Sequence, residues 1–203
     1  MASRTSPSIS PPTTMRLFLA INLPAETRDA IYADAESLRA STRGVRWVAS
    51  SALHITVKFL GEHDERFVDD IHSVLAPVGT AHVPATVTTT GVGAFPNFRR
   101  PRVVWLGMTG EAAMRALVHD VERALIPLGI PAEPRPFQAH LTLGRVKGEL
   151  APGEATALAA AAGEPRVSRT FPVQAVDLMR SELGPGGSRY SVMASVPLHA
   201  RGT

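Results

Sequence analysis

Hydrophobic residues recur along this chain with two spacings, one typical of strands and one typical of helices. Short apolar or β-branched runs predict strands at residues 16–23, 45–48, around His54 up to Gly61, 83–95, 102–108, 137–146, 170–183 and 188–198. Apolar residues repeated every three or four positions predict helices at residues 25–41, 65–79, 111–128 and 151–163. Hairpins therefore occur beside helices, which predicts an α+β protein rather than a doubly wound sheet.

Proline, glycine and a capping aspartate predict where several of these helices and strands begin or end. Pro24 opens the first helix in a turn where proline is tolerated, and Gly44 follows the end of that helix. Gly61 is expected to end the strand around His54, and Asp64 to cap the second helix. The sequence contains neither G-x-G-x-x-G nor G-x-x-x-x-G-K-S/T, so it shows no sign of the common phosphate-binding loops.

Length and composition fit one folded unit behind a polar tail. The chain has 203 residues, 44% of them hydrophobic, which is enough for a sizeable core. Residues 1–14 are mostly Ser, Thr and Pro, so we expect a disordered tail, and residues 15–203 are expected to form a single bilobal domain. The tail lacks the apolar stretch of a secretory signal, and no apolar run approaches the roughly 18 residues of a membrane span. We expect a cytoplasmic monomer with no membrane partner.

The charge and the cysteine content limit the kinds of functional site that this chain can form. The sequence has no cysteine, which excludes disulfides, thiolate metal sites and a cysteine nucleophile. The net charge is +3, and lysine occurs only at positions 58 and 147, so nearly all basic residues are arginines, whose planar forks bind phosphate well. This balance permits an anionic substrate but is too weak to indicate a long nucleic-acid groove.

A His-x-Thr motif occurs twice, in two predicted strands. The first is His54-Ile55-Thr56-Val57 and the second is His140-Leu141-Thr142-Leu143, 86 positions later, as an internal duplication into two lobes would leave them. Alternate residues of a strand share one face and lie roughly 6.6 Å apart. Each histidine therefore shares a face with its threonine, while the residue between them points into the core. If the two strands face each other, two imidazoles and two hydroxyls meet across a cleft.

Paired imidazoles suit the cleavage of a phosphodiester. With an ordinary pKa near 6.5, one histidine can act as general base while the other acts as general acid. The threonine hydroxyls can hydrogen-bond the non-bridging phosphate oxygens, and a nearby cation stabilises the charge that develops. A metal pair is the competing interpretation, but neither motif has a further histidine or a carboxylate to complete a first shell. The remaining histidines are expected to be structural or solvated, namely His63, His72, His82, His119 and His199.

These residues resemble the two-histidine (2H) phosphoesterase superfamily, which is defined by paired His-x-Thr-x motifs. Within it, the chain is similar to the RNA 2′,3′-cyclic phosphodiesterase family, also called the 2′-5′ RNA ligase family. The similarity covers residues 15–198 and includes "MRLFLAINLP", "VRWVASSALHITVKFLGE", "RPFQAHLTLGRV" and "LMRSELGPGGSRYSV". The resemblance implies two pseudo-twofold-related lobes with mainly antiparallel sheets flanked by helices, and an active-site cleft between them.

The resemblance also implies an activity and the residues that carry it. It implies hydrolysis of a terminal 2′,3′-cyclic phosphate of RNA to a 2′-phosphomonoester, with no metal and no other cofactor. By motif, His54 matches the proton donor and His140 the proton acceptor. Thr56, Thr142 and Arg145 match the residues that bind phosphate. Ala139 stands where relatives commonly carry proline, a change in local stiffness that leaves the reacting groups intact.

Two positions do not fit simple strand alternation. Phe59 and Arg145 each lie five residues after a motif histidine, so strict alternation turns both away from the catalytic face. Either a bulge in the strand or a long side chain that reaches round the strand end would bring Arg145 to the phosphate. Phe59 is either a core residue or a stacking surface for the terminal base. Arginines 99, 100 and 102 either guide the RNA backbone or belong to a solvated turn.

Three functions remain open from the residues alone. The first is hydrolysis of RNA 2′,3′-cyclic ends, and the second is the reverse reaction, which joins two RNA ends through a 2′-5′ linkage. The third is a module that binds nucleotides or RNA ends without turnover, against which the two intact motifs argue.

Overall fold

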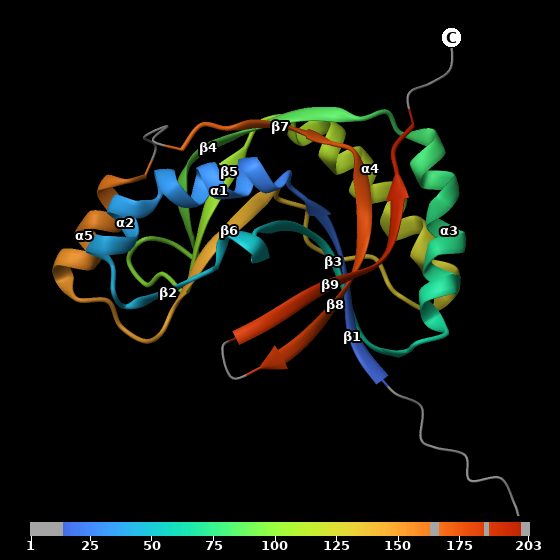
Figure 1. Cartoon of the computed structure of the whole chain (residues 1–203), viewed down its shortest axis with the longest axis horizontal. Coiled ribbons are helices and arrows are strands. Elements are labelled where there is room, and N and C mark those ends of the chain that lie inside the picture. Colours follow the sequence, from blue (N-terminus) through green and yellow to red (C-terminus); the bar gives the residue numbers. More distant parts are fainter. Residues whose placement is uncertain (1–13, 163–166, 185–186, 200–203) are drawn as a thin grey trace, which may run out of the picture.

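The computed structural model describes residues 14–162, 167–184 and 187–199, and it has an α+β architecture with two antiparallel sheets flanked by helices (Figure 1). The residues of the expected N-terminal tail lie outside the described part, apart from Thr14, which begins the first strand. No helix in the described residues is long and apolar enough to cross a membrane.

The first sheet combines strands from the two ends of the chain. Its order is β3-β1-β8-β9, and its strands are β1 (Thr14–Asn22), β3 (His54–Asp64), β8 (Ala175–Gly184) and β9 (Gly187–Pro197). Every neighbouring pair is antiparallel. Helix α3 (Phe67–Ala81) packs against β3, β8 and β9, and so it covers one face of this sheet (Figure 1).

The second sheet contains the strands between β1 and β8, other than β3. Its order is β2-β6-β5-β4-β7, and its strands are β2 (Val45–Trp47), β4 (Ala85–Phe95), β5 (Val103–Met108), β6 (His140–Val146) and β7 (Thr170–Val173). Its pairings are antiparallel as well. The two His-x-Thr motifs therefore lie in different sheets, the first on β3 and the second on β6.

The remaining helices pack mainly against one another and against α3. They are α1 (Ala25–Asp34), α2 (Glu36–Ser41), α4 (Glu111–Leu125) and α5 (Pro152–Ala160), with 3-10 turns at Ser50–Ala52 and Ile126–Leu128. Helix α4 packs against α3, while α2 packs against α5 (Figure 1).

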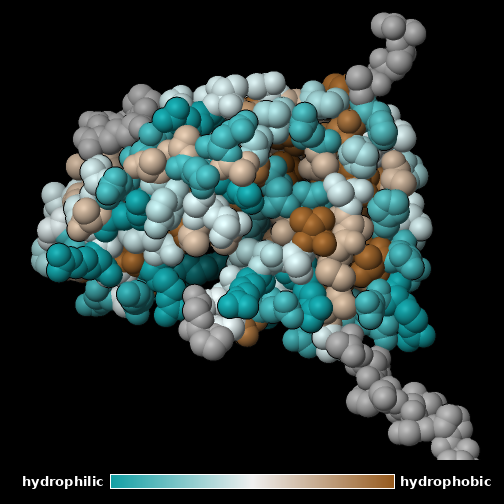
Figure 2. Space-filling model, viewed as in Figure 1, coloured by the Kyte–Doolittle hydropathy of each residue, from teal (hydrophilic) through white to brown (hydrophobic). Residues whose placement is uncertain are grey.

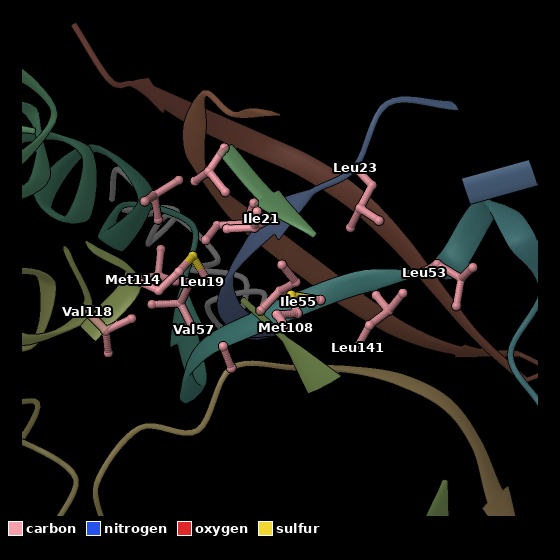
Figure 3. Close-up of a cluster of buried hydrophobic side chains, with 14 of the residues drawn as sticks. Leu19, Ile21, Leu23, Leu53, Ile55, Val57, Met108, Met114, Val118 and Leu141 are labelled. Carbon is pink, nitrogen blue, oxygen red and sulfur yellow. The ribbon is translucent and has the colours of Figure 1, made fainter. Parts of the chain in front are cut away.

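One continuous core joins the two sheets. Figure 3 shows Leu19 of β1, Ile55 of β3 and Leu141 of β6 in the same cluster as Met114 of α4. The residues between histidine and threonine in both motifs are thus fully buried, as alternation predicted, because Ile55 and Leu141 are each 0% exposed. On the opposite face of β1, Phe18 and Ala20 form a small second cluster with Met179 of β8.

Most predicted elements are present, and four boundaries differ from the prediction. Gly61 does not end its strand: β3 continues to Asp64, and Gly61 adopts a φ of 92° within it. The first predicted helix is interrupted at Ala35, between α1 and α2. Asp64 accepts a hydrogen bond from the backbone N–H of Arg66, which is the N-cap residue of α3, so Asp64 stands two positions before the N-cap. The predicted strand 170–183 is two strands, β7 and β8, which lie in different sheets.

Candidate active site

The two motif histidines are held in the same way at the starts of their strands. The Nδ1 of His54 lies 2.9 Å from the carbonyl oxygen of Ala52, and the Nδ1 of His140 lies 2.9 Å from that of Gln138. A carbonyl oxygen only accepts hydrogen bonds, so each Nδ1 carries a proton. In the neutral ring, Nε2 therefore holds the free lone pair, and in the cation it holds the transferable proton.

Both strands carry a bulge three residues after the histidine. In the pairing of β1 with β3, Leu19 lies opposite Lys58 and Ala20 opposite Thr56, so Val57 has no partner. In the pairing of β5 with β6, Val104 lies opposite Gly144 and Trp105 opposite Thr142, which leaves Leu143 without a partner. Each bulge inserts one residue and reverses the alternation beyond it.

The bulges bring Phe59 and Arg145 onto the face of the histidines, and for Arg145 a bulge was one of the two expected explanations. The ring of Phe18 lies 5.0 Å from the ring of His54 and 6.1 Å from that of Phe59, so one side chain contacts both. Phe59 is 69% exposed, which excludes the alternative that it is a core residue.

These side chains surround a cavity of about 420 Å³. His54 and Phe59 line it from the first sheet, and Thr142 and Arg145 line it from the second. Figure 2 shows the molecule hollowed near the centre of this view, with mostly hydrophilic residues around the hollow. The site thus lies where the two sheets face each other, as the duplicated motif predicted.

Two predicted residues are not among those that line this cavity. His140 packs edge-on against Phe95 at 5.1 Å and against Trp105 at 6.2 Å, and it is partly exposed. Thr56 is partly exposed at its position opposite Ala20 of β1. Both therefore remain accessible, although the cavity wall is formed by His54, Thr142 and Arg145.

His54 is the more enclosed of the two motif histidines. Its ring lies 5.0 Å from the rings of both Phe18 and Tyr190, the latter in an edge-on arrangement. Burial lowers the pKa of His54 below 6.5, and the hydrogen bond to Ala52 opposes that shift only in part. In the absence of an anion, His54 is therefore neutral over a wider pH range than an exposed histidine.

Three further residues of the cavity were missed by the sequence analysis. Arg16 of β1, Ser181 of β8 and Tyr190 of β9 form one row across the sheet, because Arg16 pairs with Ser181 and Ser181 pairs with Tyr190. The signal in the sequence was weak, since each residue stands alone in its strand. Their proximity follows from the strand order β1-β8-β9, which residue spacing does not give.

The other expected residues lie apart from the cavity. His63 stacks on Phe67 at 4.1 Å and its Nε2 donates to Leu60 O, while the Nε2 of His82 lies 2.8 Å from Asp120 Oδ2. The backbone N–H groups of Arg99 and Arg100 donate to Asn97 Oδ1, as in a solvated turn. Within the described residues, no group of three or more His, Asp or Glu side chains is arranged to hold a metal ion.

The fold and the site define an α+β protein of two antiparallel sheets, each of which presents a His-x-Thr strand toward the other. The chain belongs to the 2′-5′ RNA ligase superfamily, whose family profile matches residues 27–185.

Individual relatives agree with this assignment. A protein named RNA 2′,3′-cyclic phosphodiesterase from Methanothermobacter thermautotrophicus is 33% identical over 181 residues, which cover 88% of this chain and 96% of the relative. The crystal structure of TT0787 from Thermus thermophilus is 29% identical, with a TM-score of 0.74 over 93% of this chain and 100% of its own. A crystal structure of E. coli LigT complexed with 3′-AMP is 26% identical, with a TM-score of 0.68 over 93% of this chain and 100% of its own.

Proposed function

We propose that this protein hydrolyses the 2′,3′-cyclic phosphate at an RNA end and leaves a 2′-phosphomonoester. The family assignment and the name of the relative from Methanothermobacter thermautotrophicus support the substrate class. The single observation that carries the mechanism is the matched pair of histidines, each of which has its Nδ1 engaged by a backbone carbonyl and its Nε2 left for proton transfer.

In the proposed reaction, a water molecule attacks the phosphorus of the cyclic ester. The Nε2 of His140 accepts one proton of the water as the new P–O bond forms. The bond from phosphorus to O3′ breaks on the opposite side, and the Nε2 of His54 donates its proton to the leaving O3′. The phosphate remains on O2′, and both histidines end in the opposite protonation state, which exchange with solvent restores.

The neighbouring residues are assigned to binding. Thr56 and Thr142 donate hydroxyl hydrogen bonds to the non-bridging oxygens, and the guanidinium of Arg145 balances their charge. Phe59 offers an exposed ring on which the terminal base stacks. No step in this sequence uses a metal ion.

In this proposal, the bound substrate favours the protonated form of His54, which is the form that acts as the acid. His54 has to be protonated to donate to O3′, yet burial lowers its pKa in the free protein. An anionic phosphate placed beside the ring favours the imidazolium and raises the pKa. His54 is therefore charged chiefly when the cyclic phosphate is present, which restricts the acid to the loaded site.

Product analysis tests this function directly. An oligonucleotide with a 2′,3′-cyclic phosphate end is incubated with the protein in EDTA, and the position of the product phosphate is determined. We expect a 2′-phosphate, and a loss of roughly 10²–10⁴-fold in kcat for His54→Ala and for His140→Ala. His72→Ala, which removes an exposed histidine of α3, is the matched control and should retain full activity. Unimpaired turnover by both motif variants would refute the assignment.

The same site suits 2′-5′ ligation, in which another nucleophile attacks the cyclic phosphate, and the family's description as 2′-5′ RNA ligases favours this second function. A ribose 5′-hydroxyl takes the place of water, and the two histidines keep their roles, so no additional group is required. Mixing an RNA with a cyclic end and an RNA with a 5′-hydroxyl, then testing for a 2′-5′ linkage, distinguishes ligation from hydrolysis alone.

A further inference from the structure

A second cavity lies beside the candidate active site and shares a wall with it. Its volume is about 320 Å³. His54, Ala52 and Tyr190 line both this cavity and the first one, so the contact between the rings of His54 and Tyr190 separates two adjoining spaces. A chain that leaves the first cavity across Tyr190 enters the second.

One wall of this second cavity carries a guanidinium with unused donors. Arg28 of α1 lines the cavity, and its Nη1 makes one long hydrogen bond of 3.4 Å to the carbonyl oxygen of Ser51. Its Nε is buried and has no hydrogen-bond partner among the described residues. No described carboxylate lies within ion-pair distance of Arg28 either. Because buried donors are normally satisfied, this guanidinium is suited to an anionic ligand.

The lining also has apolar surface and hydrogen-bond acceptors. Val192 of β9, which is 54% exposed, lines the cavity together with Tyr190 and provides aliphatic surface. Asp177 of β8 lines it too, and its carboxylate accepts from Asn22 Nδ2 at 2.8 Å and from Ser195 Oγ at 2.5 Å. A carboxylate that is already held by two donors repels phosphate on this side but can still accept from a base amine.

We propose that the second cavity binds the penultimate nucleotide of the RNA substrate, with Arg28 on the phosphate that links it to the terminal nucleotide and its base against Val192. The inference rests on the proposed function and extends it: the enzyme prefers an oligonucleotide end to a free cyclic mononucleotide. The residues that line the cavity match the groups of this nucleotide. The cation Arg28 lies beside the linking phosphate, and an apolar surface with hydrogen-bond acceptors lies beside the base.

The test compares two substrates that differ by one nucleotide. Adenosine 2′,3′-cyclic phosphate fills the first cavity alone, and adenylyl-adenosine with a 2′,3′-cyclic end fills both. We expect wild-type kcat/KM to be at least about tenfold higher for the dinucleotide, as one charge-assisted contact provides. Arg28→Gln should lower the ratio of the two kcat/KM values by about tenfold. Val192→Glu should lower it as well, since it replaces the apolar surface beside the penultimate base with a charged side chain.

A matched control and three distinct outcomes distinguish a failure of the second subsite from a failure of the proposed function. Val83→Glu changes a valine of similar exposure, 49%, that lines neither cavity, and should leave the ratio at the wild-type value. Equal kcat/KM for the two substrates in the wild type would overturn the second subsite alone. An equal loss for both substrates in Arg28→Gln, with no change of ratio in Val192→Glu, would make Arg28 a support for the Ser50–Ala52 turn and overturn the subsite too. No turnover of either substrate by the wild type would overturn the proposed function itself.

Discussion

Two residues near each motif histidine shape the site, one before the histidine and one after it. The carbonyl two positions earlier fixes the proton on Nδ1, and the bulged residue three positions later turns the end of the strand back toward the cavity. Val57 and Leu143 make no hydrogen bonds with their side chains, yet they bring Phe59 and Arg145 to the face of the histidines. The repeated motif therefore extends beyond His-x-Thr to the position and conformation of an apolar residue.

The burial of His54 predicts a pH dependence of stability. Because its pKa is lower in the folded state than the ordinary value of 6.5, the unfolded chain binds more protons near and below that pH. The contribution of His54 to the free energy of unfolding is thus fully present above pH 6.5 and is lost as the pH falls from 6.5 through the lowered pKa of the folded state. Carboxylates with lowered pKa, such as Asp64 and Glu154, act at lower pH, since their ordinary values lie near 4.

Urea unfolding at pH 8 and pH 5.5 measures the contribution of His54 to the free energy of unfolding, with His54→Gln as the comparison. The wild type should lose more stability than the variant between the two pH values, because glutamine does not titrate. His72→Gln, which replaces an exposed histidine, should behave like the wild type. Identical losses in wild type and His54→Gln would mean that the folded environment of His54 does not disfavour its cation.

At the scale of elements, an enclosed ion pair ties the bulged strand to a helix. Lys58 follows the bulge in β3, and its Nζ lies 3.2 Å from Glu122 Oε1 of α4, with the side chains 5% and 16% exposed. The same Oε1 accepts the backbone N–H of Glu133 at 3.1 Å, so Glu122 also holds the segment that leads to β6. Both partners are largely desolvated, and the loss of one leaves an uncompensated charge.

We therefore expect Glu122→Gln or Lys58→Met to lower the free energy of unfolding by roughly 3–5 kcal/mol. The double variant Lys58→Met with Glu122→Leu should cost less than the sum, because it leaves no isolated charge. Arg115→Ala breaks an exposed i,i+4 pair with Glu111 and should cost less than about 1 kcal/mol. Urea unfolding of the four variants checks the order, and a Lys58→Met cost as small as that of Arg115→Ala would contradict it.

The sequence predicted most elements, and it failed where tertiary pairing decided the outcome. Periodicity identified both motif strands and their buried residues Ile55 and Leu141, since alternation is a local property. It could not split residues 170–183, because that stretch contains no glycine to mark Gln174, where the chain changes sheet. Gly61 was expected to end its strand because glycine is uncommon in strand interiors, but pairing with β1 continues from Gly61 to Asp64.

The site was predictable to the extent that it repeats. His54 and Thr142, one residue from each copy of the motif, line one cavity together with Arg145, which the family resemblance suggested, whereas Thr56 and His140 are not among the lining residues. Arg16 and Tyr190 were missed, because their place depends on which strands are neighbours. The roles of His54 as acid and His140 as base remain predictions, since the backbone holds the two rings alike.

At the scale of the whole molecule, the two sheets are not the two halves of the chain. β3 and the final strands β8 and β9 join β1, while β2 crosses to the sheet of β6, so the chain passes between the sheets several times. The offset of 86 residues predicted two lobes, and the structure shows that the chain alternates between their two sheets around one core. The interleaving fixes the distance between the sheets, and with it the width of the cavity that they share. That residues 15–203 act as a single domain is the proposal that this shared core supports.

The shared cavity also predicts how ionic strength affects catalysis. Arg16 lines it from the first sheet and Arg145 from the second, and neither forms an ion pair with a described carboxylate. Each guanidinium that contacts a phosphate of single-stranded RNA should contribute about −0.7 to the slope of log kcat/KM against log salt concentration. A cyclic-phosphate-ended oligonucleotide should therefore give a slope of about −1.4 if these two contacts act alone, and a steeper one if Arg28 also binds.

Single substitutions separate the contribution of Arg16 from a general effect of positive charge. Arg16→Gln should make the slope shallower by about 0.7, whereas Arg123→Gln, which changes an exposed arginine of α4, should leave it unchanged. If both variants gave the same slope as the wild type, Arg16 would face the cavity without contacting the RNA, and the first sheet would contribute only His54, Thr56 and the aromatic rings to substrate binding.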